Sequence, residues 1–149
     1  MRKSLMTIVL FMLLFCLQPI EVNAQGEAVL DLSEDEKVLL QQIALAEAGS
    51  QGIGGMTFVM QTILNRVESE EFPNTIEEVI FEEGQFATTK NDLYKKYEVT
   101  ANSQKALKLL DLLENRGQLY FEALSDETDT WHARNLVYIF EHEDHIFYK

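Results

Sequence analysis

The sequence predicts an α+β domain that is predominantly helical, with a small antiparallel β element near the C-terminus. Three observations support this class. Apolar residues recur at three- and four-residue spacing over two segments between residues 33 and 68. Two later segments begin with residues that favour helix N-termini. The last part of the chain contains two β-favouring runs on either side of an acidic stretch.

The first two predicted helices lie next to one another in the chain. Ser33 and Glu36 form a capping-box pattern, in which each side chain bonds the backbone N–H of the other residue. The apolar stripe that follows ends at Gly49, which is typical of a helix stop. A second helix is predicted from about Gly55 to Glu68.

Two further helices and a hairpin complete the predicted domain. Thr75 caps a short third helix, and a fourth begins at Asn102 or Ser103 and runs to Gly117. The β-favouring runs, which flank the acidic stretch, predict an antiparallel hairpin. They are Leu136–Phe140 and His145–Tyr148.

The N-terminal residues predict an export signal over residues 1–24. Two basic residues precede an apolar run over 5–17, and Ala24 ends a small-residue cleavage site. The run is shorter than the roughly 18 to 20 residues that a transmembrane helix needs, so stable membrane insertion is not expected after cleavage. An uncleaved tether on a structural protein is the alternative. Residues 25–33 then form a short leader, and 34–149 form one domain.

Composition excludes several function classes. The chain carries a net charge of −13, so a nucleic-acid partner, which requires a clustered basic face, is not expected. The single cysteine, Cys16, lies inside the predicted signal. A thiol nucleophile and a disulfide framework are therefore excluded from the mature domain, which we expect to be a secreted monomer with a core large enough to fold alone.

Glu47 is the candidate catalytic residue on local grounds. It follows Ile43 and Ala44 by four and three residues, which places its carboxyl group on the apolar stripe of the first helix. Partial withdrawal from water favours the protonated form of a carboxyl group, and this is the form that a general acid needs. Alternatively, Glu47 reaches solvent at the helix end or pairs with Arg66.

Neither a phosphate loop nor a metal site is predicted. The glycine-rich segment Gly49–Gly55 lacks the Lys and Ser/Thr that end a phosphate-binding loop. His142 and His145 have acidic neighbours, but their spacing on a hairpin matches no established ligand pattern. We therefore expect the protein to need no cofactor.

Short motifs follow one another along the chain in a fixed order. They are Ala46–Gly49, Leu64–Val67, Phe72–Thr75, Val79–Ile80, Gly84–Phe86, Leu119–Phe121, Trp131 and His145–Tyr148. This ordered set resembles the spore-cortex-lytic enzyme (SleB-type) family of cell wall hydrolases. The resemblance covers essentially the whole domain, although no single motif is specific.

The resemblance implies a lysozyme-like fold with a substrate groove. It implies cleavage of the β-1,4 bond between N-acetylmuramic acid and N-acetylglucosamine in peptidoglycan, usually as a lytic transglycosylase that leaves 1,6-anhydromuramic ends. Glu47 matches the catalytic glutamate of the family. Residues in or beside the matching motifs are the candidates for substrate binding: Asn65, Gln85, Phe86, Tyr120, His145 and Tyr148.

Two alternatives stay open beside the transglycosylase. An ordinary hydrolase needs a second carboxylate, for which Glu82 and Glu83 are the nearest candidates. A catalytically silent, secreted glycan-binding protein is the other alternative, although such a protein has little use for the carboxyl group of Glu47. The sequence also departs from the family after Glu47, because Ala48–Gln51 lacks the arginine and the second acidic residue found in many members.

Overall fold

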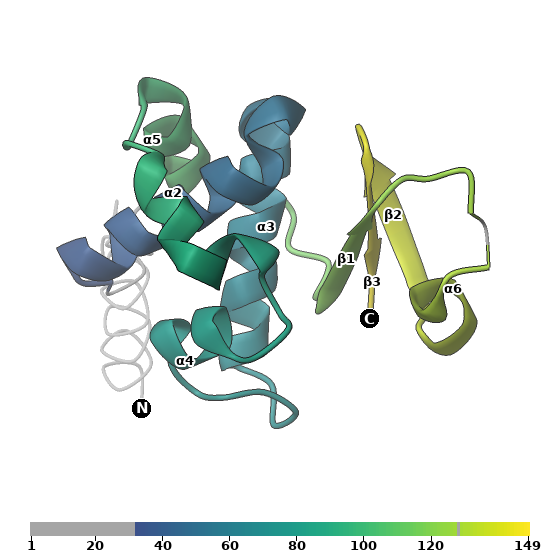
Figure 1. The fold of residues 1–149 in the computed structure, drawn as a ribbon. Helices are drawn as coiled ribbons and strands as arrows, with labels where there is room; N and C mark the ends of the chain where they lie inside the picture. The colour runs from purple at the N-terminus through teal and green to yellow at the C-terminus, as the bar shows by residue number, and fades with distance from the viewer. Residues whose placement is uncertain (1–31, 128) are drawn as a thin grey trace, which may run out of the picture.

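The computed structural model describes residues 32–127 and 129–149. The predicted signal, residues 1–24, lies outside the described residues. Helices form one side of the domain, and a small sheet stands beside helix α3 on the other side (Figure 1). This arrangement confirms the predicted α+β class with a C-terminal antiparallel element.

The first two predicted helices are confirmed, with small changes at their ends. Helix α2 (Glu34–Ala48) begins at the predicted capping box, in which the Ser33 hydroxyl accepts from the N–H of Glu36 and the Glu36 carboxylate accepts from the N–H of Ser33. The chain continues through a short 3-10 helix, η1 (Gly49–Gln51), directly into α3 (Gly52–Val67). The two helices pack against one another and form the centre of the core.

The segment after α3 returns across the helical side. Helix α4 (Ile76–Phe81) has the predicted cap, because the Thr75 hydroxyl accepts from the N–H of Glu78. A 3-10 helix, η2 (Ala87–Lys96), follows and packs against α2. The sequence analysis did not predict η2, which lacks a side-chain cap and a regular apolar stripe.

The predicted start of the fourth helix was wrong. Helix α5 (Ala101–Lys108) is capped by Thr100, which lies before both predicted capping residues. The Thr100 hydroxyl accepts from the N–H of Ser103, and the Ser103 hydroxyl accepts from the N–H of Thr100. Ser103 is therefore the inner partner of a capping box rather than the cap itself.

The predicted end of this helix, at Gly117, was also wrong. After Lys108 the chain forms turns. The buried amide of Gln61 on α3 donates to the backbone carbonyl of Leu113 at 3.1 Å and approaches that of Leu110 at 3.4 Å. These carbonyl groups bond a side chain from another helix, so the turn segment is held against α3 without a continuing helix.

The sheet has the strand order β1-β3-β2 and is antiparallel throughout. Strands β2 (Tyr138–His142) and β3 (His145–Tyr148) form the predicted hairpin. Strand β1 (Tyr120–Ala123) pairs with the other side of β3, and helix α6 (Trp131–Asn135) lies between β1 and β2 in the chain. Neither β1 nor α6 was predicted as an element.

Aromatic side chains join the sheet to α3. The ring of Phe58 on α3 packs edge-on against Phe140 and Phe147, with centroid distances of 4.9 and 5.6 Å. Close approach also depends on Gly54, because a Cβ atom there would lie 2.9 Å from the His142 ring. This contact fixes the sheet beside the first turns of α3, close to the end of α2.

Candidate active site

Glu47 lies at the end of α2, one residue before the helix stops. Its side chain is partly buried, whereas Ile43, Ala44 and Ala48 around it are completely buried. Oε1 of Glu47 accepts a 2.6 Å hydrogen bond from the hydroxyl of Thr88. The carboxyl group is therefore held at the edge of the core and does not extend freely into solvent.

Thr88 reaches Glu47 because the start of η2 is anchored. Phe86, just before η2, has only 2% of its surface exposed. The backbone carbonyl of Phe86 accepts from both the N–H and the hydroxyl of Thr89, at 3.2 and 2.7 Å. Sequence analysis missed Thr88, and its position two residues after the Gly84–Phe86 motif was the only available signal.

His145 is the second polar side chain of this site. It begins β3, has 7% of its surface exposed, and its Nδ1 is buried without a hydrogen-bond partner among the described residues. Burial lowers the pKa of His145, and the nearby charges of Glu47 and Asp144 offset part of this effect. Near neutral pH the imidazole beside Glu47 is thus predominantly uncharged.

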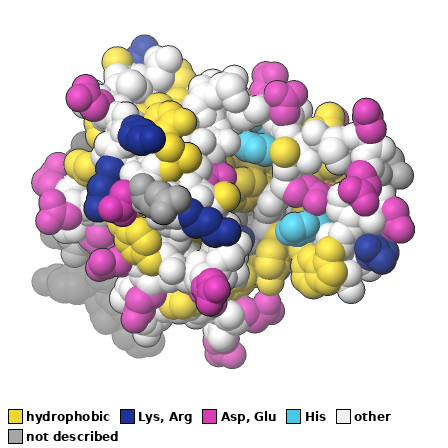
Figure 2. Space-filling view, in the orientation of Figure 1, with side chains coloured by type: hydrophobic (Ala, Val, Ile, Leu, Met, Phe, Trp, Pro, Cys, Tyr) yellow, Lys and Arg dark blue, Asp and Glu magenta, His cyan; other side chains and the backbone are white. Residues whose placement is uncertain are grey.

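A pair of hydrogen bonds places His145 near the end of α2. Oε1 of Gln51, on η1, accepts from the backbone N–H of Asp144 at 2.7 Å. Nε2 of Gln51 donates to the Asp144 carboxylate at 3.2 Å. The turn of the hairpin is therefore attached to the short segment that follows Glu47. Figure 2 shows the surface hollowed between the helical side and the sheet, with histidine and acidic side chains at the rim.

Asn65 and Arg66 are buried on α3 and bond to the segment that leads into β1. The Asn65 amide exchanges hydrogen bonds with Asn115 and donates to the backbone carbonyl of Gln118 at 2.8 Å. Nε of Arg66 donates to the carbonyl of Leu119 at 2.7 Å. No ion pair joins Arg66 to Glu47 within the described part of the chain, so the pairing considered from sequence does not occur.

Arg66 lies among aromatic rings. Its guanidinium carbon is 4.9, 5.4 and 5.6 Å from the ring centroids of Phe72, Phe86 and Tyr120. Burial lowers the pKa of Arg66 to about 10, with partial compensation from Tyr120 and Glu82, so the side chain is still charged at neutral pH. Arg66 therefore packs among all three rings, one of which, Phe86, belongs to the Gly84–Phe86 segment.

The remaining predicted substrate-binding residues are not all brought to Glu47. Gln85 is partly exposed, whereas the ring of Phe86 has almost no free surface for a sugar. Side chains alternate along β3, so Tyr148 lies on the face opposite to His145. Tyr120 pairs with Tyr148 in the register and lies on that same face.

The two candidate second carboxylates, Glu82 and Glu83, lie in different surroundings. Glu83 is exposed, whereas Glu82 is partly buried and has a buried Oε2 without a hydrogen-bond partner among the described residues. Glu82 acts electrostatically on Arg66. No hydrogen bond or ion pair connects either residue to Glu47 in residues 32–127 and 129–149.

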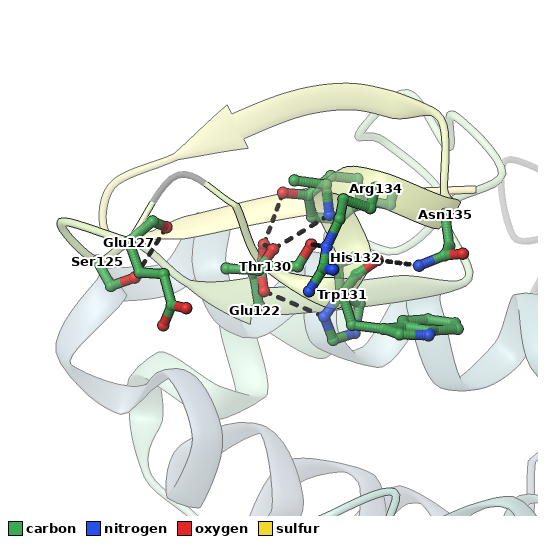
Figure 3. Close-up of polar contacts among 10 residues, drawn as sticks. Glu122, Ser125, Glu127, Thr130, Trp131, His132, Arg134 and Asn135 are labelled. Atoms are coloured by element: carbon green, nitrogen blue, oxygen red, sulfur yellow. Dashed lines mark hydrogen bonds and ion pairs between the residues drawn. The ribbon is translucent and has the colours of Figure 1, made fainter.

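On the opposite face of the sheet, a carboxylate joins three elements (Figure 3). Oε1 of Glu122 on β1 accepts from Thr130 at 2.8 Å and from the Tyr148 hydroxyl at 2.7 Å. Oε2 lies 3.1 Å from Nδ1 of His132 on α6. Burial, followed by the bond to Glu122, raises the pKa of Tyr148 to about 12. The sequence analysis did not identify Glu122, Thr130 or His132.

The described part of the chain has neither a metal-binding cluster nor a membrane-spanning helix. Residues 32–127 and 129–149 contain no group of three or more His, Cys, Asp or Glu side chains placed to hold a metal ion. No helix formed by these residues has the length and apolar character needed to cross a bilayer.

Comparisons with known proteins agree with this fold. Residues 50–148 match the sequence model of a family described as cell wall hydrolase, a span that begins just after Glu47. The fold is similar to the catalytic domain of the germination-specific lytic transglycosylase SleB from Bacillus anthracis, with a TM-score of 0.68, 24% identity, and coverage of 80% of this chain and 98% of that one. It is similar to the catalytic domain of the Bacillus cereus SleB protein, with a TM-score of 0.68, 25% identity, and coverage of 78% and 91%. No curated protein matches the sequence significantly.

Proposed function

Because the chain belongs to the cell wall hydrolase family and is an enzyme acting on peptidoglycan, we propose that Glu47 is the general acid that cleaves the glycan strands. The position of Glu47 is the observation that carries this proposal. Its carboxyl group is partly buried at the end of α2, bonded to Thr88 and close to a buried imidazole. One of the similar solved structures is a lytic transglycosylase, which favours the same reaction class for this chain.

The proposed reaction breaks the β-1,4 bond between N-acetylmuramic acid and N-acetylglucosamine. Protonated Glu47 gives its proton to the glycosidic oxygen, and the bond from that oxygen to C1 of the muramic acid breaks. The 6-hydroxyl oxygen of the same muramic acid then bonds C1 and loses its proton to the Glu47 carboxylate. The products are a strand with a 1,6-anhydromuramic end and a strand with a free 4-hydroxyl group, and Glu47 returns to its starting state.

A threonine hydroxyl suits a carboxyl group that alternates between acid and base. The hydroxyl of Thr88 donates to the Glu47 carboxylate, and the same oxygen can accept from the protonated carboxyl group. The bond can therefore persist through both proton transfers while the orientation of Glu47 is kept. A lysine or arginine in this place would instead strongly favour the ionised form and oppose the first step.

His145 contributes through its lack of charge. The burial that lowers its pKa leaves an uncharged imidazole beside Glu47 near neutral pH. An uncharged neighbour does not hold Glu47 in its ionised state, as a cation would.

The other candidate residues divide into three groups. Gln85 is partly exposed near Phe86 and Thr88, and we assign it to contact sugar hydroxyl or acetamido groups. Phe86 is buried and anchors that segment, whereas Asn65 is buried and bonds the segment that leads into β1. Tyr120 and Tyr148 lie on the other face of the sheet from His145, where they help to hold β3 in place.

The proposal also includes the setting of the enzyme. An exported or cell-wall-associated protein is consistent with the predicted signal over residues 1–24 and with the family. We propose that it acts as a monomer and without a cofactor. The runner-up reaction, hydrolysis, would require Glu82 or Glu83 as the second carboxylate, but Glu82 lies close to Arg66 and Glu83 is exposed.

Mass spectrometry of the soluble products tests the reaction. Purified protein is incubated with peptidoglycan, and the muramic ends of the fragments are identified. Fragments ending in 1,6-anhydromuramic acid are expected. Reducing muramic ends would overturn the transglycosylase in favour of hydrolysis, and reducing N-acetylglucosamine ends would overturn the assigned bond.

A further inference from the structure

Trp131 is an exposed aromatic side chain on a firmly held support. It is the single tryptophan of the chain, opens the short helix α6, and has 57% of its surface exposed. Burial of a large aromatic side chain ordinarily stabilises a fold, so an indole left open to solvent contributes little of that stabilisation. An exposed indole can instead serve in binding. For that role the backbone that carries it has to be held rigidly.

The support of Trp131 is fixed by polar contacts on both sides. The neighbouring Thr130 hydroxyl accepts from the N–H of Ala133 at 3.1 Å and donates to Glu122 at 2.8 Å. Nδ1 of His132, on the other side of Trp131, lies 3.1 Å from the same carboxylate. Figure 3 shows the indole extending away from this network, which leaves its faces free of the polar contacts. The side chain is thus presented in advance of any binding.

A series of rings connects Trp131 with the proposed active site. The centroid distances are 5.5 Å from Trp131 to His132, 6.3 Å from His132 to Tyr120, and 5.7 Å from Tyr120 to Phe72. All of these rings except Trp131 are partly buried, and Arg66 links Tyr120 and Phe72 to Phe86.

This series leads to the segment that carries Gln85 and Thr88, and Thr88 bonds Glu47. The support of Trp131 is therefore joined by packed side chains to the segment whose Thr88 bonds Glu47.

The chemistry of this surface favours an uncharged sugar. The C–H groups of a pyranose ring pack well on an indole face. The carboxylate of Glu122 accepts from two hydroxyl groups and lies 3.1 Å from Nδ1 of His132, so its oxygens are already engaged within the protein. A chain with a net charge of −13 gains no long-range attraction to an anionic polymer, so contact with its neutral sugars has to supply the affinity.

We propose that Trp131 forms a distal subsite that stacks on an N-acetylated hexosamine of the glycan strand, several sugars away from the bond that Glu47 cuts. This inference rests on the proposed function, because it takes the substrate to be a glycan strand that extends from Glu47 past the sheet to α6. The subsite makes the enzyme prefer long strands over short fragments and contributes to KM rather than to kcat.

The single tryptophan allows a direct test by fluorescence. The Glu47→Gln variant is titrated with bare oligomers of N-acetylglucosamine of increasing length. Long oligomers should shift the emission to the blue and protect the indole from acrylamide, whereas a disaccharide should do neither. Unchanged emission while the long oligomer binds, measured by calorimetry, would overturn the subsite. A change seen only with peptide-bearing strands would overturn the sugar as its ligand.

Kinetics on the active protein separates this inference from the proposed function. Trp131→Ala should raise KM for long strands about tenfold and leave kcat unchanged. Trp131→Phe should retain most of the affinity. Leu112→Ala, which shortens another exposed apolar side chain (75% exposed), is the matched control and should change neither constant. An unchanged KM in a Trp131→Ala variant that cuts peptidoglycan would refute the subsite alone, and a wild-type protein that cuts no glycan would refute the proposed function.

Discussion

The hydroxyl of Thr88 lies 2.6 Å from Oε1 of Glu47, across 41 residues of sequence. It is the hydrogen bond found for the Glu47 carboxyl group among the described residues, and it comes from an element that sequence patterns did not predict. The orientation of the proposed catalytic acid therefore depends on how the start of η2 folds against α2.

Removal of this hydroxyl should slow the reaction without weakening binding. A hydrogen bond to a charged group is worth about 1.5–3 kcal/mol, so Thr88→Val should lower kcat by roughly ten- to a hundredfold. KM should be almost unchanged, and Thr88→Ser should restore kcat because it keeps the donor. Steady-state kinetics on soluble glycan strands gives both constants. A Val variant as fast as the wild type would show that Thr88 does not orient Glu47.

The bond pair between Gln51 and Asp144 should stabilise the fold and the site together. Gln51→Ala removes both hydrogen bonds that attach the hairpin turn. Its free energy of unfolding should fall by about 1–3 kcal/mol, because the partner groups lose their bonds. Gln51→Glu keeps an acceptor for the Asp144 N–H but places two carboxylates together, so its loss should be similar or larger. Denaturant unfolding that is unaffected by either change would contradict the assigned contact.

His145 should make the protein less stable as the pH falls. Its folded-state pKa lies below the unfolded value, so the unfolded chain takes up the proton first. The contribution of the uncharged His145 to the free energy of unfolding is therefore complete above about pH 6.5. It is lost on acidification, with a slope of at most about 1.4 kcal/mol per pH unit.

A comparison with His145→Gln isolates this effect. Glu47, Asp144 and His142 also act on the imidazole, and all three are kept in the variant. The difference in unfolding free energy between the two proteins should shrink from about pH 7.5 to 5.5. A difference that instead grows on acidification would mean that the carboxylates outweigh burial.

Tyr148 should limit stability at alkaline pH. Its pKa is raised to about 12 by burial and by the bond to Glu122, whereas a tyrosine of the unfolded chain ionises near 10. Stability is therefore retained below about pH 10 and lost between about pH 10 and 12. Tyr148→Phe has no hydroxyl to ionise, so its unfolding free energy should decline less steeply over this range. An equally steep decline would assign the alkaline limb to other groups.

Local signals in the sequence were sufficient for several elements. The Ser33–Glu36 capping box and the Thr75 cap involve residues that are three apart, so the pattern contains the whole interaction. The hairpin also follows from two β-favouring runs and a short turn. The same kind of signal at Thr100 is less distinct in the sequence, because serine replaces the usual glutamate as the inner partner.

The parts that could not be predicted depend on contacts between distant segments. The carbonyl groups of Leu110 and Leu113, which follow α5, bond Gln61, which lies about 50 residues earlier. The pairing of β1 is made with the last residues of the chain. Thr88 has no unusual neighbours in sequence, and only the packing of η2 brings it to Glu47. The sequence alone could not show whether the Asn65 side chain contacts a ligand or makes a structural bond. In the structure its amide group bonds Asn115 and Gln118.

The rate of glycan cleavage by Glu47→Gln, compared with the wild type, tests the central claim most directly. The amide keeps the shape and can still bond Thr88, but it cannot give a proton to the glycosidic oxygen. We predict a loss of at least about a hundredfold in kcat, with an unchanged unfolding midpoint and retained binding of strands. A variant that releases anhydromuramic fragments at the wild-type rate would contradict Glu47 as the catalytic acid.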